Sequence, residues 1–481
     1  MDSNNKDKKI LFIEPSGSKA NVFTFAMKLP LLGPIQLATR LHEAGFNVRV
    51  IKENLLNKSD KIENYLPTAD ILILTLLTNS ALRGYEIAKK YKEIRPDGRT
   101  IIGGIHASLN PEEASLYADQ VAVGEGDNII IDLIKGTLTE KIVYGSPLIN
   151  LDNRPIPDFS LMINARKSKI IPIMTSLGCP FNCTFCCVTL VYGRKYRIQS
   201  PERTIKEVKQ QLQFFKKKKI FFYDDNFCAK KKISLEFLEK IKDENLKFKW
   251  ITQVRADIAN DEEFIKKMAE AGCRRVFIGF ESINDATLKD LNKNETVEEV
   301  RQAVKIFQRY GISVHGMFIF GSDEDNPEVF KNTIKFCRKN LLEFAQFLAI
   351  TPFPGTQYYQ SIGKSRILST NWDYYDGFHV NVKPKNMSQK EVMDGILKAY
   401  KKVFGWWKIF RQFCRDFICL FRFKCRTFKY RINKLFNDFG RNIGMRISIR
   451  KWKKLNKEYI LEVSQNEKDS SYALVPLRCC Q

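Results

Sequence analysis

Two series of short apolar segments, each followed by a helical pattern, constrain the fold of this 481-residue chain more than any other feature. The segments of the first series are residues 9–14, 46–51, 69–74, 100–102 and 121–123. Short apolar strands that alternate with helices are typical of a parallel, doubly wound sheet, whose ligands bind beyond the carboxyl ends of the strands. The sequence therefore predicts an α/β, Rossmann-like domain over residues 1–145.

The second series follows a proline-containing stretch, which we interpret as a linker over residues 146–165. Its six apolar segments are residues 171–176, 220–223, 249–254, 275–280, 313–320 and 347–351. Six strands that are each followed by a helical pattern predict a partial (β/α)6 TIM-like barrel, with a site at the C-terminal ends of its strands. We expect this barrel over residues 166–385 and a helical, basic, aromatic-rich region over residues 386–481.

Three cysteines, spaced as C-x-x-x-C-x-x-C, follow the first strand of the predicted barrel: Cys179, Cys183 and Cys186. Cysteine thiolates normally hold iron–sulfur clusters, and a cluster with three protein ligands keeps one iron open for catalysis. A structural zinc site needs a fourth ligand nearby, but Cys187 is adjacent and the next histidine downstream is His315. A C-x-x-C redox pair leaves Cys179 unexplained. The spacing therefore predicts a 4Fe-4S cluster.

This cysteine loop, with Phe185 before its last cysteine, resembles the motif of the radical S-adenosylmethionine (SAM) superfamily. The resemblance implies that the open iron binds the amino and carboxylate groups of SAM, with Phe185 in the SAM site. It also implies that one electron from the reduced cluster cleaves SAM to methionine and a 5′-deoxyadenosyl radical, so that the cofactor carries the difficult chemistry. An electron donor such as flavodoxin or ferredoxin is then required.

Polar residues end three further strands of the predicted barrel. Asp224 and Asp225 end the second strand, Arg255 follows the third and Glu281 ends the fourth. In the resembled family the second strand end holds the SAM amino group. Arg255 could pair bidentately with the SAM carboxylate, and Glu281 could bind the ribose hydroxyls. The alternatives are a pair of helix-capping aspartates and a surface ion pair of Arg255.

The N-terminal domain is similar, at residues 30–41 and 103–108, to the cobalamin (B12)-binding domain that precedes the radical SAM core in one large subgroup. Glycines let backbone approach a bulky ligand closely, and threonines could donate hydrogen bonds to its nucleotide tail. The resemblance implies cobalamin contacts by Thr75, Thr78, Gly103, Gly104, His106, Gly124, Glu125 and Gly126, although His106 could instead be a packed residue after a Gly-Gly turn.

One departure from the cobalamin pattern concerns cobalt. Domains that supply a histidine to cobalt carry D-x-H-x-x-G after the first strand, whereas residues 14–20 contain no histidine. Either cobalt lacks a histidine ligand here, as in many members of this subgroup, or the domain has lost its cofactor.

The net charge of +25 is concentrated near the C-terminal end, where residues 401–454 carry seventeen Lys or Arg and two acids. Aromatic residues recur between them at helical spacing. The segment could be a helix packed on the barrel with a solvated basic face, or an interfacial helix on anionic lipid. Nucleic-acid binding is the least favoured alternative. Without a secretory signal or an apolar run of about 18–20 residues, we expect a cytoplasmic protein that could contact the inner face of the membrane.

These features predict a radical SAM enzyme that uses cobalamin to C-methylate an unactivated carbon of a small molecule, with a lipid or a tetrapyrrole as the hypothesised substrate. The alternative within this subgroup is an oxidative cyclase reaction on a tetrapyrrole, as in the anaerobic cyclase of magnesium-protoporphyrin ester. A methylthiotransferase is disfavoured, because those enzymes have three further N-terminal cysteines and this chain has none before Cys179. A non-catalytic cobalamin or iron–sulfur sensor is the alternative of another class.

Overall fold

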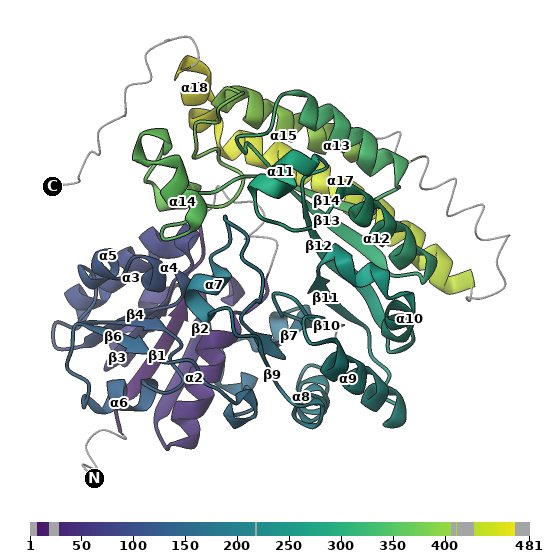
Figure 1. Ribbon diagram of the computed structural model, residues 1–481. Helices are drawn as coiled ribbons and strands as arrows, with labels where there is room; N and C mark the ends of the chain where they lie inside the picture. Colours follow the sequence, from purple (N-terminus) through teal and green to yellow (C-terminus); the bar gives the residue numbers. More distant parts are fainter. Residues whose placement is uncertain (1–6, 19–27, 217–218, 406–409, 411–427, 467–481) are drawn as a thin grey trace.

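The computed structural model describes residues 7–18, 28–216, 219–405, 410 and 428–466, without the side chains of 428–439 and 441. Its first sheet contains six parallel strands in the order β2-β1-β3-β4-β5-β6 (Figure 1). These strands are β1 (Lys9–Glu14), β2 (Asn47–Lys52), β3 (Ile71–Thr75), β4 (Arg99–Gly103), β5 (Gln120–Gly124) and β6 (Ile142–Gly145). The predicted doubly wound domain is therefore confirmed, with β6 as an additional strand.

Helices cover both faces of this sheet (Figure 1). Phe12 packs on the side of α2 (Leu32–Glu43) and α6 (Ile130–Lys135), and Ile13 packs on the side of α3 (Ala81–Ile94), α4 (Ile105–Leu109) and α5 (Pro111–Ser115). Successive residues of a strand point to opposite faces, so both faces of a covered sheet must be apolar. The unbroken apolar run of β1 meets this requirement.

The second sheet is a six-stranded parallel half-barrel in the order β14-β13-β12-β11-β10-β7. Its strands are β7 (Ile170–Ile173), β10 (Lys219–Phe222), β11 (Trp250–Val254), β12 (Cys273–Glu281), β13 (Ser313–Phe320) and β14 (Phe344–Ala349). Its outer helices are α8 (Pro201–Phe214), α9 (Lys231–Asp243), α10 (Glu262–Glu270), α12 (Val297–Arg309) and α13 (Glu328–Lys339). The sheet thus has the predicted partial TIM-like architecture.

Several helices of the barrel and the C-terminal region begin at residues that cap them. Ser200, Thr296 and Ser388 each accept a hydrogen bond from a backbone N–H in the first turn of α8, α12 and α15 (Gln389–Val403), respectively. Such caps satisfy N–H groups that have no partner within the helix.

Residues between the two sheets are packed rather than loose. Phe159, Leu161 and Met162 are buried, and the N–H of Ile163 donates to the carbonyl of Val50 on β2 at 2.9 Å. One apolar core runs from the α2 side of the first sheet through these residues into the barrel. The segment interpreted as a linker therefore joins the domains in a fixed relation.

The last described helices are α17 (Phe428–Leu455) and α18 (Lys457–Asn466), and α17 runs along the outside of the barrel in Figure 1. Trp452 and Tyr459 are buried, and Asn456 bonds the buried ring of His379 at 2.9 Å. This part of the segment packs on the barrel, while residues 406–409 and 411–427 lie outside the described residues. Within the described ranges, no helix combines the length and apolar character needed to cross a bilayer.

Candidate active site

The carboxyl ends of the two sheets border one cavity of about 330 Å³ between the domains. The N-terminal domain contributes apolar side chains that include Phe12, Leu31, Leu37, Ile73, Ile101 and Leu133. The barrel contributes Met174, Leu177, Cys187, Val191, Tyr223 and Asp225. A mostly apolar pocket with a few polar groups is the usual form of a small-molecule site.

The cysteine loop leaves and re-enters a short antiparallel ribbon of β8 (Ser176–Leu177) and β9 (Arg197–Ile198). Gly178 has a φ of +83°, and a Cβ there would lie 2.7 Å from the carbonyl oxygen of Lys195. Only glycine fits such a conformation at such a close approach. The N–H of Cys179 then donates to the carbonyl of Gly193 at 3.3 Å, which fixes the start of the loop.

The far side of the loop is held by the barrel. The N–H of Thr184 donates to the carbonyl of Leu291 at 3.1 Å, and its carbonyl accepts from the N–H of Tyr358 at 2.9 Å. Leu291 follows α11 (Asp285–Asp290), and Tyr358 belongs to α14 (Gln357–Ile362). The loop is therefore fixed by backbone contacts that leave its thiols unused.

The three thiols are half-buried and lie in one electrostatic environment. Burial raises the pKa of all three, and the charge of Cys183 further raises the pKa of Cys179 and of Cys186. Three neighbouring thiolates are thus unfavourable without a cation between them. In the described part of the chain, no three His, Cys, Asp or Glu side chains converge closely enough to hold a single metal ion.

Asp224 and Asp225 have different environments although they are adjacent. Asp224 is buried, and it accepts hydrogen bonds from the N–H and the hydroxyl of Thr175 at 2.8 and 3.1 Å and two more from Ser176. Asp225 instead lines the cavity and is accessible from it. Desolvation in the mostly apolar cavity and the charge of Asp224 raise the pKa of Asp225 to about 7. Asp225 is thus the member of the pair that can meet a ligand.

Arg255 lies beside the cysteine loop. Its guanidinium stacks on the ring of Phe181 at 3.7 Å and donates to the carbonyl of Lys293 at 2.6 Å. Its Nε is buried and makes no hydrogen bond among the described residues, and its nearest carboxylate, that of Asp257, lies 3.7 Å away. An orphaned buried donor of this kind suits a carboxylate ligand.

Glu281 ends β12 at a break in strand register and has a φ of +56°. Its carboxylate pairs with the buried Nζ of Lys293 at 3.1 Å, and Lys293 also lies 3.7 Å from Glu295. Backbone strain of this kind persists only where the surroundings over-determine it, as at ligand sites. Sequence reasoning missed Phe181, Lys293 and Glu295; the charged stretch after α11 was the available signal.

The N-terminal wall includes six of the eight residues predicted to contact cobalamin: Thr75, Gly103, Gly104, Gly124, Glu125 and Gly126. Gly104 has a φ of +96°, and a Cβ there would lie 2.8 Å from the backbone N and O of Leu76. Glycine is therefore required at this strand end.

Thr78 and His106 are the two residues that do not line the cavity. The His106 ring is fully buried, bonds the hydroxyl of Tyr85 at 3.0 Å and packs edge-on against Trp372. It therefore has the packing role considered as the alternative, because the helix after Gly104 directs it away from the cavity.

Family comparisons agree with this arrangement. The family described as "Radical SAM superfamily" matches residues 173–337, and the "B12 binding domain" matches residues 18–134. The bacteriochlorophyllide d C-12(1)-methyltransferase of Chlorobaculum tepidum is 30% identical over 411 residues, which cover 82% of this chain and 87% of that protein. The chain belongs to the radical SAM superfamily. Its N-terminal domain is a B12-binding domain.

Two further proteins are similar to this radical SAM enzyme. The anaerobic magnesium-protoporphyrin IX monomethyl ester cyclase of Rubrivivax gelatinosus is 24% identical and covers 82% of this chain and 77% of that protein. The solved structure of OxsB, a cobalamin-dependent SAM radical enzyme, has a TM-score of 0.67 at 16% identity, over 96% of this chain and 81% of OxsB. At that identity the likeness shows a shared fold.

The donor sets of the radical SAM enzyme fit its cofactors, a 4Fe-4S cluster, SAM and cobalamin. A cubane carries its irons at separate corners, so three thiols can bind one iron each without converging on one point. The Nε of Arg255, which makes no hydrogen bond among the described residues, and the carboxylate of Asp225 suit the charged ends of SAM. The apolar cavity with glycines at its edge suits a flat, bulky ligand such as the corrin ring.

Phe185, the remaining predicted SAM residue, is partly buried against a small cluster that includes Leu291 and Ile350. It joins the cysteine loop to the carboxyl ends of the last barrel strands.

Proposed function

We propose that this radical SAM enzyme transfers a methyl group to an unactivated carbon of a bulky, apolar small molecule of the tetrapyrrole class. The observation that carries this proposal is the shared cavity, which Cys187 of the cysteine loop borders on one side and Gly103 and Gly104 border on the other. A reaction that uses both cofactors on one substrate requires that both sites open into one space.

Several of the enzyme's own residues then have definite roles. Cys179, Cys183 and Cys186 hold the cluster, while Arg255 and Asp225 orient the charged groups of SAM. Glu281, fixed by Lys293, accepts hydrogen bonds from the ribose. When bound, the cluster and SAM supply hydrogen-atom removal, and cobalamin supplies the methyl group.

The apolar walls exclude water from this reaction. Leu31, Leu37, Leu177 and Val191 face the cavity from both domains. Exclusion of water prevents side reactions of reactive species. The same walls favour an apolar substrate, and the similar protein from Chlorobaculum tepidum acts, by its name, on bacteriochlorophyllide d.

The test is an anaerobic assay of the full-length protein, reconstituted with iron and sulfide and supplied with hydroxocobalamin and dithionite. The probes are SAM with a deuterated methyl group and bacteriochlorophyllide d. We expect 5′-deoxyadenosine and a pigment that is heavier by one labelled methyl group. Cys183→Ala should abolish both products, whereas Cys337→Ala, a buried cysteine on α13, should retain them.

Two results would contradict the proposal at different levels. No 5′-deoxyadenosine from the wild type, or an equal yield from Cys183→Ala, would exclude radical SAM chemistry and favour a sensor. A 5′-deoxyadenosine yield with an unlabelled, ring-closed product from a protoporphyrin ester would favour the cyclase alternative, for which the similar Rubrivivax protein is the supporting observation.

Two partners complete the proposal. A reduced carrier of the flavodoxin or ferredoxin class would supply the electron, and should replace dithionite in the assay.

Residues 401–454 would contact an anionic membrane surface, because Lys453 and Lys454 are exposed near exposed Ile447 and Leu455 on α17. Basic and apolar side chains side by side suit the headgroup boundary of a membrane. Sedimentation with phosphatidylglycerol vesicles, and its weakening in Lys453→Glu/Lys454→Glu, tests the contact; equal binding to phosphatidylcholine would contradict it.

A further inference from the structure

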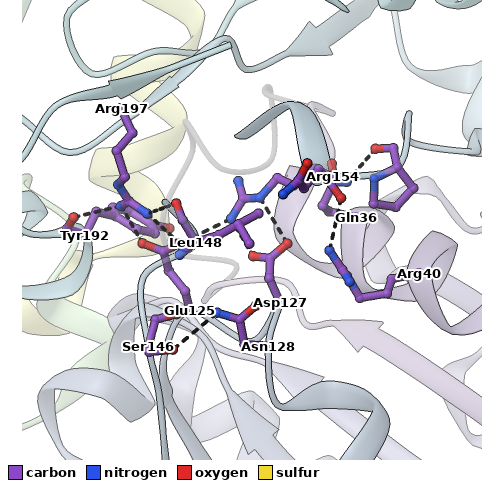
Figure 2. A network of polar contacts seen from close by, with 12 residues as sticks. Gln36, Arg40, Glu125, Asp127, Asn128, Ser146, Leu148, Arg154, Tyr192 and Arg197 are labelled. Atoms are coloured by element: carbon purple, nitrogen blue, oxygen red, sulfur yellow. Dashed lines mark hydrogen bonds and ion pairs between the residues drawn. The ribbon is translucent and has the colours of Figure 1, made fainter. Parts of the chain in front are cut away.

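A buried network of charged residues joins the cavity edge of the B12-binding domain to the cysteine loop (Figure 2). Glu125 lies between Gly124 and Gly126, and its carboxylate accepts from the Arg197 guanidinium at 2.9 Å and from the N–H of Leu148 at 3.2 Å. Arg197 belongs to β9 of the barrel domain. The ion pair therefore connects residues 72 positions apart, one from each domain.

A second pair extends this network. Arg154, from the segment between the sheets, donates from Nε to Asp127 at 3.0 Å and lies 3.5 Å from Glu125. The four charged side chains, Glu125, Asp127, Arg154 and Arg197, are each at most 9% exposed. Two acids and two bases balance one another. Burial of such pairs costs much of the Coulomb energy that they gain, so they stabilise a protein less than they specify a geometry.

Arg197 contacts both ends of the chain segment that carries the three cysteines. It pairs with Leu177 across the β8–β9 ribbon, two residues before Cys179. Its guanidinium also donates to the carbonyl of Tyr192 at 2.9 Å. Tyr192 is the last residue of α7 (Val188–Tyr192), which begins directly after Cys187. A shift of Arg197 would therefore shift the residues at both ends of the cysteine loop.

Glu125 has the matching position in the other domain. Glu125, Asp127 and the glycines around them line the cavity on the side assigned to cobalamin. A corrinoid that contacts the backbone of residues 124–127 will restrain this loop. The carboxylate of Glu125 has little freedom to accommodate a shift independently, because Arg197 and Leu148 both bind it.

We propose that Glu125 and Arg197 are positioning residues that couple cobalamin binding to the order of the cysteine loop, residues 178–192. The coupling rests on the proposed function only in assigning cobalamin and the cluster to these two sites. Because binding free energies are linked, the coupling is reciprocal: cobalamin orders the cysteine loop, and an ordered, cluster-loaded loop tightens cobalamin binding by the same factor.

The test is hydrogen exchange of the full-length, cluster-loaded protein, read on peptides that cover residues 176–198, with and without hydroxocobalamin. In the wild type, cobalamin should slow this exchange about fivefold or more. Removal of one charge could unfold the protein, because it leaves a buried partner unpaired. The decisive variant is therefore Glu125→Gln/Arg197→Met, which removes both charges. Exchange is compared at a cobalamin concentration that saturates the variant's own site, as measured by spectral titration, and there the double variant should show less than about a twofold change in exchange.

A matched control is Asp323→Asn, which breaks the half-buried ion pair with Arg366 within the barrel domain. In this variant, cobalamin should slow hydrogen exchange at residues 176–198 as it does in the wild type. Transmission by the double variant at the wild-type level would overturn the inference, as would cobalamin binding to the wild type without any change at residues 176–198. Failure of the wild type to bind cobalamin at all would instead overturn the proposed function, and the coupling with it.

Discussion

The carboxylate of Asp224 accepts hydrogen bonds from both the backbone N–H and the hydroxyl of Ser176, at 2.5 and 2.7 Å. Ser176 is the first residue of β8 and lies two residues before Gly178, which precedes Cys179. Asp224, which follows β10, therefore fixes the start of the cysteine loop through hydrogen bonds that lie within the protein.

Replacement of this carboxylate should reduce cluster loading. In Asp224→Asn, an NH₂ group would face donors of Thr175 and Ser176, and each unsatisfied buried group costs about 1–3 kcal/mol. We expect lower free energy of unfolding by about that amount and less iron per chain after reconstitution. The matched variant Asp225→Asn should keep its iron, because Asp225 faces the cavity. Equal iron loss in both variants would contradict the distinction.

The stability contribution of Asp225 should depend on pH. Its folded-state pKa of about 7 lies above the value of about 3.9 for an unfolded chain. As pH rises between these values, the unfolded state releases its proton first, so the folded state becomes less stable. Asp225→Asn should therefore gain stability relative to the wild type between pH 5 and pH 8. Urea unfolding of the metal-free proteins at both pH values measures this; a constant difference would contradict it.

The backbone at Gly104 should not tolerate a side chain. Gly104→Ala places a methyl group against the backbone of Leu76 at a positive φ. We expect a loss of about 1–3 kcal/mol in unfolding free energy and weaker cobalamin binding in a spectral titration. Gly33→Ala is the control on the same cavity, because nothing lies within 4 Å of its Cβ position. Comparable losses in the two variants would show that the geometry at Gly104 is unimportant.

The guanidinium of Arg255 should be irreplaceable by an amine. Lysine has the same charge but cannot offer a planar fork that stacks on Phe181 and donates in two directions. Arg255→Lys should weaken equilibrium SAM binding about tenfold to hundredfold, since hydrogen bonds to charged groups contribute about 1.5–3 kcal/mol. Arg274 lies at the start of β12, at the opposite end of that strand from Glu281, so Arg274→Lys should bind SAM normally. Unchanged affinity in Arg255→Lys would place the SAM carboxylate elsewhere.

Sequence periodicity was sufficient to predict eleven strand positions and both six-stranded sheets, because buried parallel strands appear in the sequence as short apolar runs between helical patterns. It missed the two-residue ribbon strands β8 and β9, and it missed β6, which has four residues and includes the exposed Tyr144. An edge strand buries little, so it leaves a weak apolar signal.

Motif reasoning identified the cysteine loop and most of the residues around the cavity, but it could not separate Asp224 from Asp225. Both follow the same strand, and only the three-dimensional position of Thr175 and Ser176 decides which carboxylate is occupied. The same limit explains the missed Lys293 and the Glu125–Arg197 pair. Their partners are far apart along the chain, and single charged residues carry no periodicity.

The ribbon of β8 and β9 has a consequence for how the metal centre is assembled. Because Leu177 pairs with Arg197, the ends of the chain between them are joined by backbone contacts that involve no thiol. The entropy of closing that loop is lost during folding and does not count against metal capture. The free energy of cluster binding should therefore contain little cost for bringing the two ends of this loop together.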